Sequence, residues 1–271
     1  MNSKRRNSVR ILLVFIVIIS IFFPSIRSFY NQGTNKEFIE KIENNVISGN
    51  IKIVRLNHKS GFNTTSISRS PGASGVIIRK EGERYFALTA NHVMTEMDNV
   101  DKTQFVTMRY DDQDFTFSQI KEESFKGSAD YYMEFPEIKV ERTSEKYDLA
   151  LISFESDKEF TVVTLAENDP EYGDKVAAMS NPYGKRNVVT IGHIGNKKNW
   201  SFEDEAGKIQ YPIIKHSAVL SEGSSGSALL NEDLEIVGIN LGGNENILHR
   251  FISGMAMPID QIRIFLAEVE K

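Results

Sequence analysis

The sequence predicts an all-β protein that is flanked by an apolar N-terminal segment and a C-terminal helix. Between residues 50 and 258, short runs rich in Val, Ile, Phe, Tyr and Thr alternate with turns rich in Gly, Asn and Asp, a pattern typical of sandwiches and barrels. The chain has 271 residues, 40% of them hydrophobic, which is enough for a sizeable core. It contains no cysteine, which excludes disulfides, thiol nucleophiles and zinc–thiolate sites.

Residues 1–30 form a cytoplasmic basic tail followed by a membrane anchor or signal segment. The apolar run Ile11–Phe23 has 13 residues, the length of a signal-peptide hydrophobic region. The segment that can lie in a membrane is longer if it is counted from Arg10 to Arg27, because the apolar stems of arginine side chains can reach the membrane–water interface. No small-x-small cleavage motif follows, so we expect an uncleaved single-pass anchor, with secretion after signal cleavage as the alternative. The basic flank stays inside and the folded domain lies outside the cell membrane.

Two helices are expected around the β region. Residues 31–49 are predicted to form a linker helix, since Thr34 and Glu37 have the spacing of a capping box. At the other end, Pro258 suits a first helical position and is followed by an apolar stripe at helical spacing. Residues 50–271 therefore constitute the folded domain.

The charge distribution excludes some partners. The formal net charge is −5. Several basic residues lie in the N-terminal segment, before the first acidic residue, so the rest of the chain is more acidic than this net charge indicates. No basic patch remains for a nucleic acid, so a DNA or RNA partner is not expected. The polar segment 111–147 is predicted to form solvated hairpins and loops. A calcium site is the alternative, which is disfavoured because the carboxylates lack a Gly-centred loop with a closing Glu. We expect neither a metal nor a cofactor.

Two positions have the chemistry of an acid–base pair. His92 follows the strand RYFALTA and lies where this strand leaves the sheet, a common place for functional groups. Asp148 opens the apolar run DLALISF, and a carboxylate at the mouth of a buried strand needs a partner such as an imidazole N–H. Taken alone, Asp148 is equally well explained as the end of a polar loop.

The stretch Ser221–Glu232, SEGSSGSALLNE, is either a flexible linker or an ordered turn. Apolar β segments flank it on both sides, which favours a tight turn inside the β domain. Gly223 and Gly226 allow backbone conformations that are closed to other residues. Such conformations let successive N–H groups point at one spot, as in a backbone oxyanion hole.

The motifs LTANHV, DLALI and GSSGSAL, in the order His, Asp, Ser, resemble the chymotrypsin-fold (trypsin-like) serine proteases. The likeness is to the bacterial branch that includes HtrA-type proteases and glutamyl endopeptidases, without the PDZ domain of the former. GDKVAAMSNPYG, IVGINLGG and SGMAMPIDQI resemble further segments of that family, so the likeness extends over residues 50–271. It implies two antiparallel six-stranded β-barrels with the active site between them.

The resemblance also implies the site. Ser225 occupies the nucleophile position of the motif, His92 that of the general base, and Asp148 that of the residue that orients the base. The oxyanion hole is then formed by the backbone at Gly223, Ser224 and Ser225. The implied function is a serine endopeptidase acting on polypeptides.

The substrate pocket is expected at Val219, Asn240, Leu241 and Gly242. Val219 stands six residues before Ser225, where trypsin-like specificity needs an acid, and Asn240 replaces the histidine of glutamyl endopeptidases. We therefore expect an apolar or small residue before the scissile bond. The natural substrate and oligomeric state stay open.

An alternative is a catalytically silent relative that binds peptides or partner proteins. Ser224 and Ser227 differ from the commonest residues of the family motif, which leaves the oxyanion loop open to a different conformation.

Overall fold

The computed structural model describes residues 33–269, with gaps at 62–64, 71, 97–98, 119–124, 126, 196–197, 205–206, 246 and 249. The predicted membrane segment lies outside these described residues. Within them, no helix is both long and apolar enough to cross a membrane. The chain divides into two compact units, Met1–Ile42 and Glu43–Lys271.

A helix is present within the range 31–49 that was expected to be helical. Residues 33–45 are helical, and a 3-10 turn, η1 (Ile47–Gly49), leads into the first strand. Lys36 and Glu40, one turn apart on this helix, form an ion pair of 3.3 Å.

The first sheet is antiparallel and curls until its ends meet. The strand order is β2-β1-β3-β4-β7-β6, and β5 pairs with the other side of β1. A single bridge between Val106 and Glu137 joins β5 to the segment that precedes β6. Alternate residues such as Ile51, Ile53 and Ile77 are buried in one core. The strands are β1 (Asn50–Ser60), β2 (Thr65–Arg69), β3 (Ala73–Glu81), β4 (Arg84–Ala90), β5 (Lys102–Met108), β6 (Lys139–Ser144) and β7 (Leu149–Glu155).

The second sheet repeats this plan. Its order is β10-β11-β14-β13-β12-β8-β9, and a bridge between Ile194 and His216 joins the residue after β9 to β11. Val176, Ala178 and Leu229 belong to its core. The strands are β8 (Lys175–Ser180), β9 (Val188–His193), β10 (Lys198–Asp204), β11 (Gly207–His216), β12 (Ala228–Leu230), β13 (Ile236–Glu245) and β14 (Phe251–Pro258).

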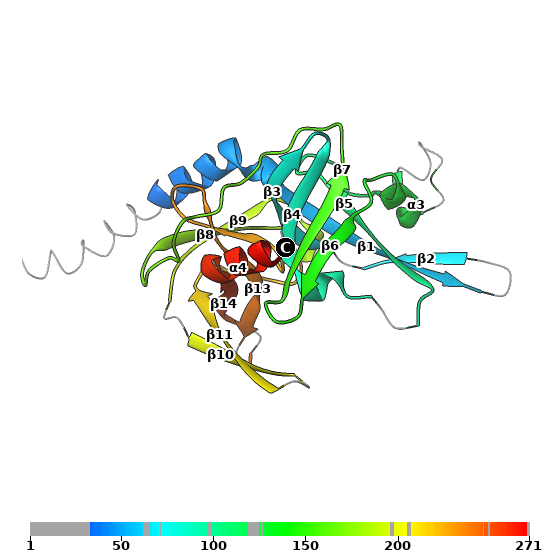
Figure 1. Cartoon of the computed structure of the whole chain (residues 1–271). Helices are drawn as coiled ribbons and strands as arrows, with labels where there is room; N and C mark the ends of the chain where they lie inside the picture. The colour runs from blue at the N-terminus through cyan, green and yellow to red at the C-terminus, as the bar shows by residue number, and fades with distance from the viewer. Residues whose placement is uncertain are drawn as a thin grey trace, which may run out of the picture. The chain divides into compact units, whose positions relative to one another are not determined.

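The predicted all-β class is confirmed, and the domain consists of two curled antiparallel sheets followed by helix α4 (Ile259–Val269), which packs beside β13 and β14 (Figure 1). Each sheet has seven strands, where six were expected. The additional strands are β2 and β10, which pair only with β1 and β11 as hairpin extensions of a six-stranded sheet.

The polar segment 111–147 differs from its prediction in one respect. It contains a short helix, α3 (Ser128–Met133), where only hairpins and loops were expected. Tyr131 and Tyr132 on this helix are buried against Val54 and Leu56 of β1. The aromatic residues of the segment therefore form a small satellite core, which its many charges obscure in the sequence.

Candidate active site

The pairing of β4 with β7 brings His92 and Asp148 together. Ala90, the last residue of β4, lies opposite Leu149, the first residue of β7. His92 follows in the 3-10 turn η2 (Asn91–Met94), and Asp148 precedes Leu149. The His92 ring Nδ1 lies 2.7 Å from Asp148 Oδ2, and the His92 backbone N–H donates to Oδ1 at 2.9 Å.

The backbone of Asp148 is also fixed. Its carbonyl accepts a hydrogen bond of 3.0 Å from the Asn91 N–H. Its φ is +48°, in the left-handed region that Asp and Asn adopt more readily than other side chains. The turn thus places the carboxylate within hydrogen-bond distance of the imidazole. Both side chains remain partly exposed.

Ser225 and His92 line the same pocket. This pocket, of about 310 Å³, is also lined by Gly223 and Glu222 of the Ser225 turn and by Val93 next to His92. The Ser225 hydroxyl donates to the Leu241 carbonyl at 3.1 Å. No hydrogen bond joins Ser225 to His92 in the part of the chain that is described, so the hydroxyl must rotate before it can pass its proton to the imidazole.

The N–H of Gly223 has a fixed direction. The preceding carbonyl, that of Glu222, accepts a short hydrogen bond of 2.7 Å from the Tyr183 N–H. Because C=O and N–H point in opposite directions across a planar trans peptide, this bond also fixes the Gly223 N–H. The Gly223 N–H itself donates to no described residue.

The N–H of Ser225 is fixed in the same way, through the Ser224 carbonyl, which accepts from the Ser227 N–H at 3.1 Å. It too donates to no described residue. Ser224 differs from its prediction as a third donor, because its own N–H is bonded to the Ser221 carbonyl at 2.9 Å. Two free N–H groups, rather than three, are available to an oxyanion.

The four residues predicted for the substrate pocket lie in different environments. Val219 is 49% exposed. Asn240 is fully buried, and its side chain accepts from His216 Nε2 at 2.9 Å and donates to Ser227 Oγ at 2.9 Å. Its prediction as a pocket residue is wrong, since both ends of the amide are engaged inside the protein. A register shift between Asn240 and Gly242 separates the two along β13.

Leu241 does line a cavity beside the acid–base pair. This second pocket, of about 290 Å³, contains His92 and Asp148 on one wall and the apolar side chains of Ile213, Leu241 and Met257 on the other. The three apolar residues come from the second sheet, so the pocket lies between the two sheets.

Burial governs the chemistry of His216. Its side chain is 2% exposed, and this desolvation lowers the pKa of His216 to about 4, against the opposing effect of the hydrogen bond to Asn240. The neutral ring packs over Gly254, where a Cβ atom would come within 2.2 Å of it. His216 therefore has a structural role in the interior of the second sheet.

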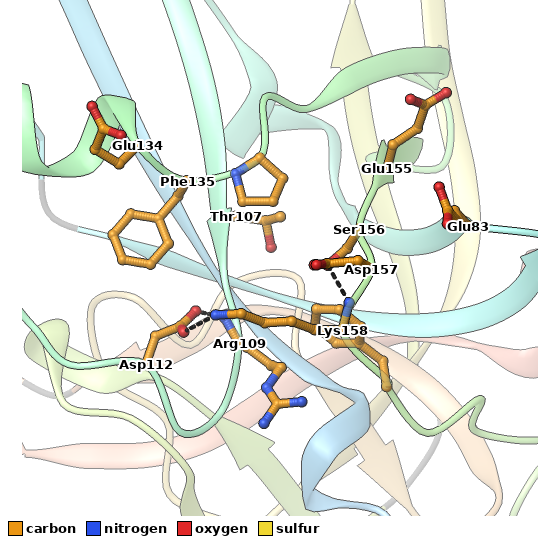
Figure 2. Close-up of a pocket in the computed structure, with 12 residues that line it drawn as sticks. Glu83, Thr107, Arg109, Asp112, Glu134, Phe135, Glu155, Ser156, Asp157 and Lys158 are labelled. Atoms are coloured by element: carbon orange, nitrogen blue, oxygen red, sulfur yellow. Dashed lines mark hydrogen bonds and ion pairs between the residues drawn. The ribbon is translucent and has the colours of Figure 1, made fainter.

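A larger cavity, of about 390 Å³, lies elsewhere on the first sheet and contains none of the predicted catalytic residues (Figure 2). Its basic groups are paired, Lys158 with Asp112 at 3.0 Å and Arg109 with Asp111. Among the described residues, no cluster of three or more acidic or histidine side chains is placed to hold a metal.

Sequence reasoning missed two residues of this site. Ser74 is fully buried on β3 and contacts the Ser225 turn, and Tyr183, with φ +52°, donates to it. A serine inside an apolar strand is a signal that a hydrogen-bonded partner exists, although the sequence does not say which partner.

Residues 73–239 match the family model described as a trypsin-like peptidase domain. Serine protease HTRA4 of Homo sapiens is 31% identical over 125 residues, which cover 45% of this chain and 25% of that protein. Serine protease HTRA1 of Xenopus tropicalis is 32% identical over 127 residues, covering 46% and 26%. The chain thus spans about a quarter of the length of these relatives. Since the family model covers more than half of the chain, the protein belongs to the family of trypsin-like peptidase domains.

Proposed function

We propose that the protein is a serine endopeptidase that hydrolyses peptide bonds through an acyl-enzyme on Ser225. The observation that carries this proposal is the 2.7 Å contact between His92 Nδ1 and Asp148 Oδ2, next to the pocket that His92 shares with Ser225. A carboxylate at Nδ1 keeps the proton on that nitrogen, which leaves the lone pair of Nε2 free to act as a base. Family membership supports the same chemistry.

In the first half of the reaction, Ser225 Oγ attacks the carbonyl carbon of the scissile bond while His92 Nε2 takes the hydroxyl proton. The carbonyl oxygen becomes an oxyanion, which receives hydrogen bonds from the N–H groups of Gly223 and Ser225. As the intermediate collapses, the C–N bond breaks and His92 gives its proton to the leaving amine. Asp148 stabilises the imidazolium throughout.

In the second half, a water molecule replaces the amine. His92 removes a proton from this water, whose oxygen attacks the acyl carbon. The C–O bond to Ser225 then breaks, and the serine oxygen recovers its proton from His92. The products are a carboxylic acid and an amine, and the enzyme returns to its initial protonation state.

The test is cleavage of casein by the domain and by three serine variants. Ser225→Ala is expected to abolish cleavage, whereas Ser224→Ala and Ser227→Ala retain detectable cleavage because neither side chain reacts. Full activity of folded Ser225→Ala would refute the assignment of the nucleophile. Casein that binds to the wild-type domain and is never cut would instead support the silent peptide-binding alternative.

The expected substrates are polypeptides with an apolar or small residue before the scissile bond. The apolar wall of Ile213, Leu241 and Met257 beside His92 supports apolar side chains near the reacting bond. Mass spectrometry of the casein fragments tests this preference, and cuts that occur predominantly after Lys, Arg or Glu would contradict it.

We also propose that the domain is held at the outer face of the cell membrane by residues 1–30. The support is the apolar run Ile11–Phe23 with its basic flank. Membrane fractionation of cells that express the full chain tests this, and recovery of a shortened protein from the medium would favour signal cleavage.

A further inference from the structure

The hydroxyl of Ser74 has all of its hydrogen-bonding capacity in use. Its oxygen accepts from the Asn181 backbone N–H at 2.9 Å and from Asn181 Nδ2 at 3.2 Å, and its hydrogen is donated to the Gly223 carbonyl at 2.8 Å. Because a hydroxyl has one hydrogen and two acceptor sites, the two bonds from Asn181 leave Gly223 as the one direction for the hydrogen.

Asn181 is itself held in place. It is 1% exposed, its Nδ2 donates to the Ile51 carbonyl at 2.9 Å, and its Oδ1 accepts from Asn50 Nδ2 at 3.0 Å. Both partners lie on β1, the neighbour of β3. The orientation of the Ser74 hydroxyl is thus set by a buried network that extends from the first sheet to the end of β8 in the second.

Ser74 makes two hydrogen bonds to the turn that carries Ser225. Besides the side-chain bond to Gly223, its backbone N–H donates to the Ser225 carbonyl at 3.0 Å. The two carbonyls that it holds flank Ser224, so one residue of the first sheet spans the centre of the turn. The fit is close, because a Cβ atom at Gly223 would lie 2.7 Å from the Asn181 carbonyl oxygen and 2.9 Å from that of Gly72.

Gly223 is one of the two glycines of this turn with a positive φ, and it is the one whose carbonyl Ser74 holds. Its φ is +92°, and a glycine can rotate at little cost between several backbone conformations. The peptide on its N-terminal side is held by Tyr183, through the Glu222 carbonyl, and the peptide on its C-terminal side by Ser74. With the Ser74 hydroxyl removed, the Gly223 carbonyl loses its bond to the first sheet. The bond from the Tyr183 N–H to the Glu222 carbonyl and the bond from the Ser224 N–H to the Ser221 carbonyl remain, but neither of them ties Gly223 to β3. The turn is therefore less restrained in the conformation that presents the N–H groups to an oxyanion.

We propose that Ser74 is a positioning residue for the reaction at Ser225: its side-chain hydroxyl holds the Gly223–Ser224 peptide so that the oxyanion hole is formed before substrate binds. This inference rests on the proposed endopeptidase function. Ser74 does not touch the reacting atoms, and it acts through Gly223.

The experiment measures labelling by an alkyl fluorophosphonate, whose phosphoryl oxygen occupies the oxyanion hole when serine attacks. For Ser74→Ala we expect the maximal labelling rate constant to fall by about 10- to 100-fold. This decrease does not exceed the decrease that follows removal of one oxyanion donor. The reagent concentration at half-maximal rate should stay within about 3-fold, because the turn donors act in the transition state rather than in the first encounter. Ser74→Cys replaces the hydroxyl by a somewhat larger thiol that is still a weak donor, and its rate is expected to lie between those of the wild type and Ser74→Ala.

The matched control is Ser153→Ala, which removes another buried, hydrogen-bonded serine, on β7. It is expected to lose stability but to keep the wild-type labelling rate. If Ser74→Ala does not fold, Ser74→Cys alone decides the matter, since a wild-type rate for that folded variant overturns the inference. A wild-type rate for folded Ser74→Ala overturns it as well. Absence of labelling in the wild-type protein would refute the proposed function itself, a result distinct from either of these.

Discussion

The carboxylate of Asp148 accepts two hydrogen bonds from one residue, His92: one from the ring Nδ1 at 2.7 Å and one from the backbone N–H at 2.9 Å. The backbone bond fixes the carboxylate relative to the turn that carries the imidazole, and the ring bond then fixes the imidazole. The relationship follows from the register of β4 and β7, which places the end of one strand beside the start of the other.

Asp148→Asn should separate orientation from charge. Asn tolerates the left-handed backbone at this position, so the turn is expected to fold. An amide that donates to Nδ1 would stabilise the wrong tautomer, with the proton on Nε2, and we expect kcat/KM to fall by about 10³- to 10⁴-fold. Hydrolysis of a fluorogenic casein measures the effect. The exposed Asp157→Asn serves as control, and a loss below about 10-fold at position 148 would contradict the role of Asp148.

The ion pair of Lys52 and Asp114 should respond unequally to removal of its two members. The Lys52 side chain is 1% exposed, and its ammonium group also donates to the Gly184 carbonyl at 3.0 Å. Burial lowers the pKa of Lys52, while Asp114 opposes this shift. Asp114→Asn leaves a buried cation without its partner and is expected to cost about 3 kcal/mol of unfolding free energy. Lys52→Met removes the cation itself and should cost less, because Asp114 retains Arg186 at 3.5 Å.

Urea unfolding of both variants at pH 7 measures this difference. A larger loss of unfolding free energy for Lys52→Met than for Asp114→Asn would contradict this account, because it would show that burial of the unpaired cation is not costly.

His216 should make the stability of the domain depend on pH. Its pKa is lowered to about 4 in the folded protein, mainly by desolvation, whereas an exposed histidine titrates near 6.5. Between these values the unfolded chain binds a proton that the folded protein does not, so this contribution to stability falls as pH drops from about 6.5 to 4. At pH 5 the loss relative to pH 7 is about 2 kcal/mol.

His216→Gln keeps a donor for Asn240 and removes the titration. The difference in unfolding free energy between pH 7 and pH 5 should therefore shrink in this variant, as measured by urea unfolding at the two pH values. Equal pH dependence in the variant and the wild type would contradict the account of His216.

Much of the arrangement was accessible from the sequence because it depends on local signals. The alternation of β-branched residues with turns predicts the strands, and the breaks at His92, at Asp148 and in the glycine-rich turn predict where side chains leave the sheets. Pro258 and the apolar stripe after it predict α4. The membrane segment stays a prediction, since it lies outside the described residues.

What the sequence could not provide depends on contacts between distant segments. The motif places Asn240 in the substrate pocket, yet the shift of register in β13 and the partners His216 and Ser227 hold its amide in the interior. The motif also predicts Ser224 as an oxyanion donor, although a local turn bond to Ser221 engages its N–H. Both outcomes turn on the direction of individual polar groups, which residue spacing does not specify.

The most direct test of the central claim is the site of labelling by an alkyl fluorophosphonate. The account predicts one adduct per wild-type chain, located by mass spectrometry on Ser225, and no adduct on folded Ser225→Ala. An adduct on Ser224 or Ser227 in the wild type, or equal labelling of Ser225→Ala, would contradict it.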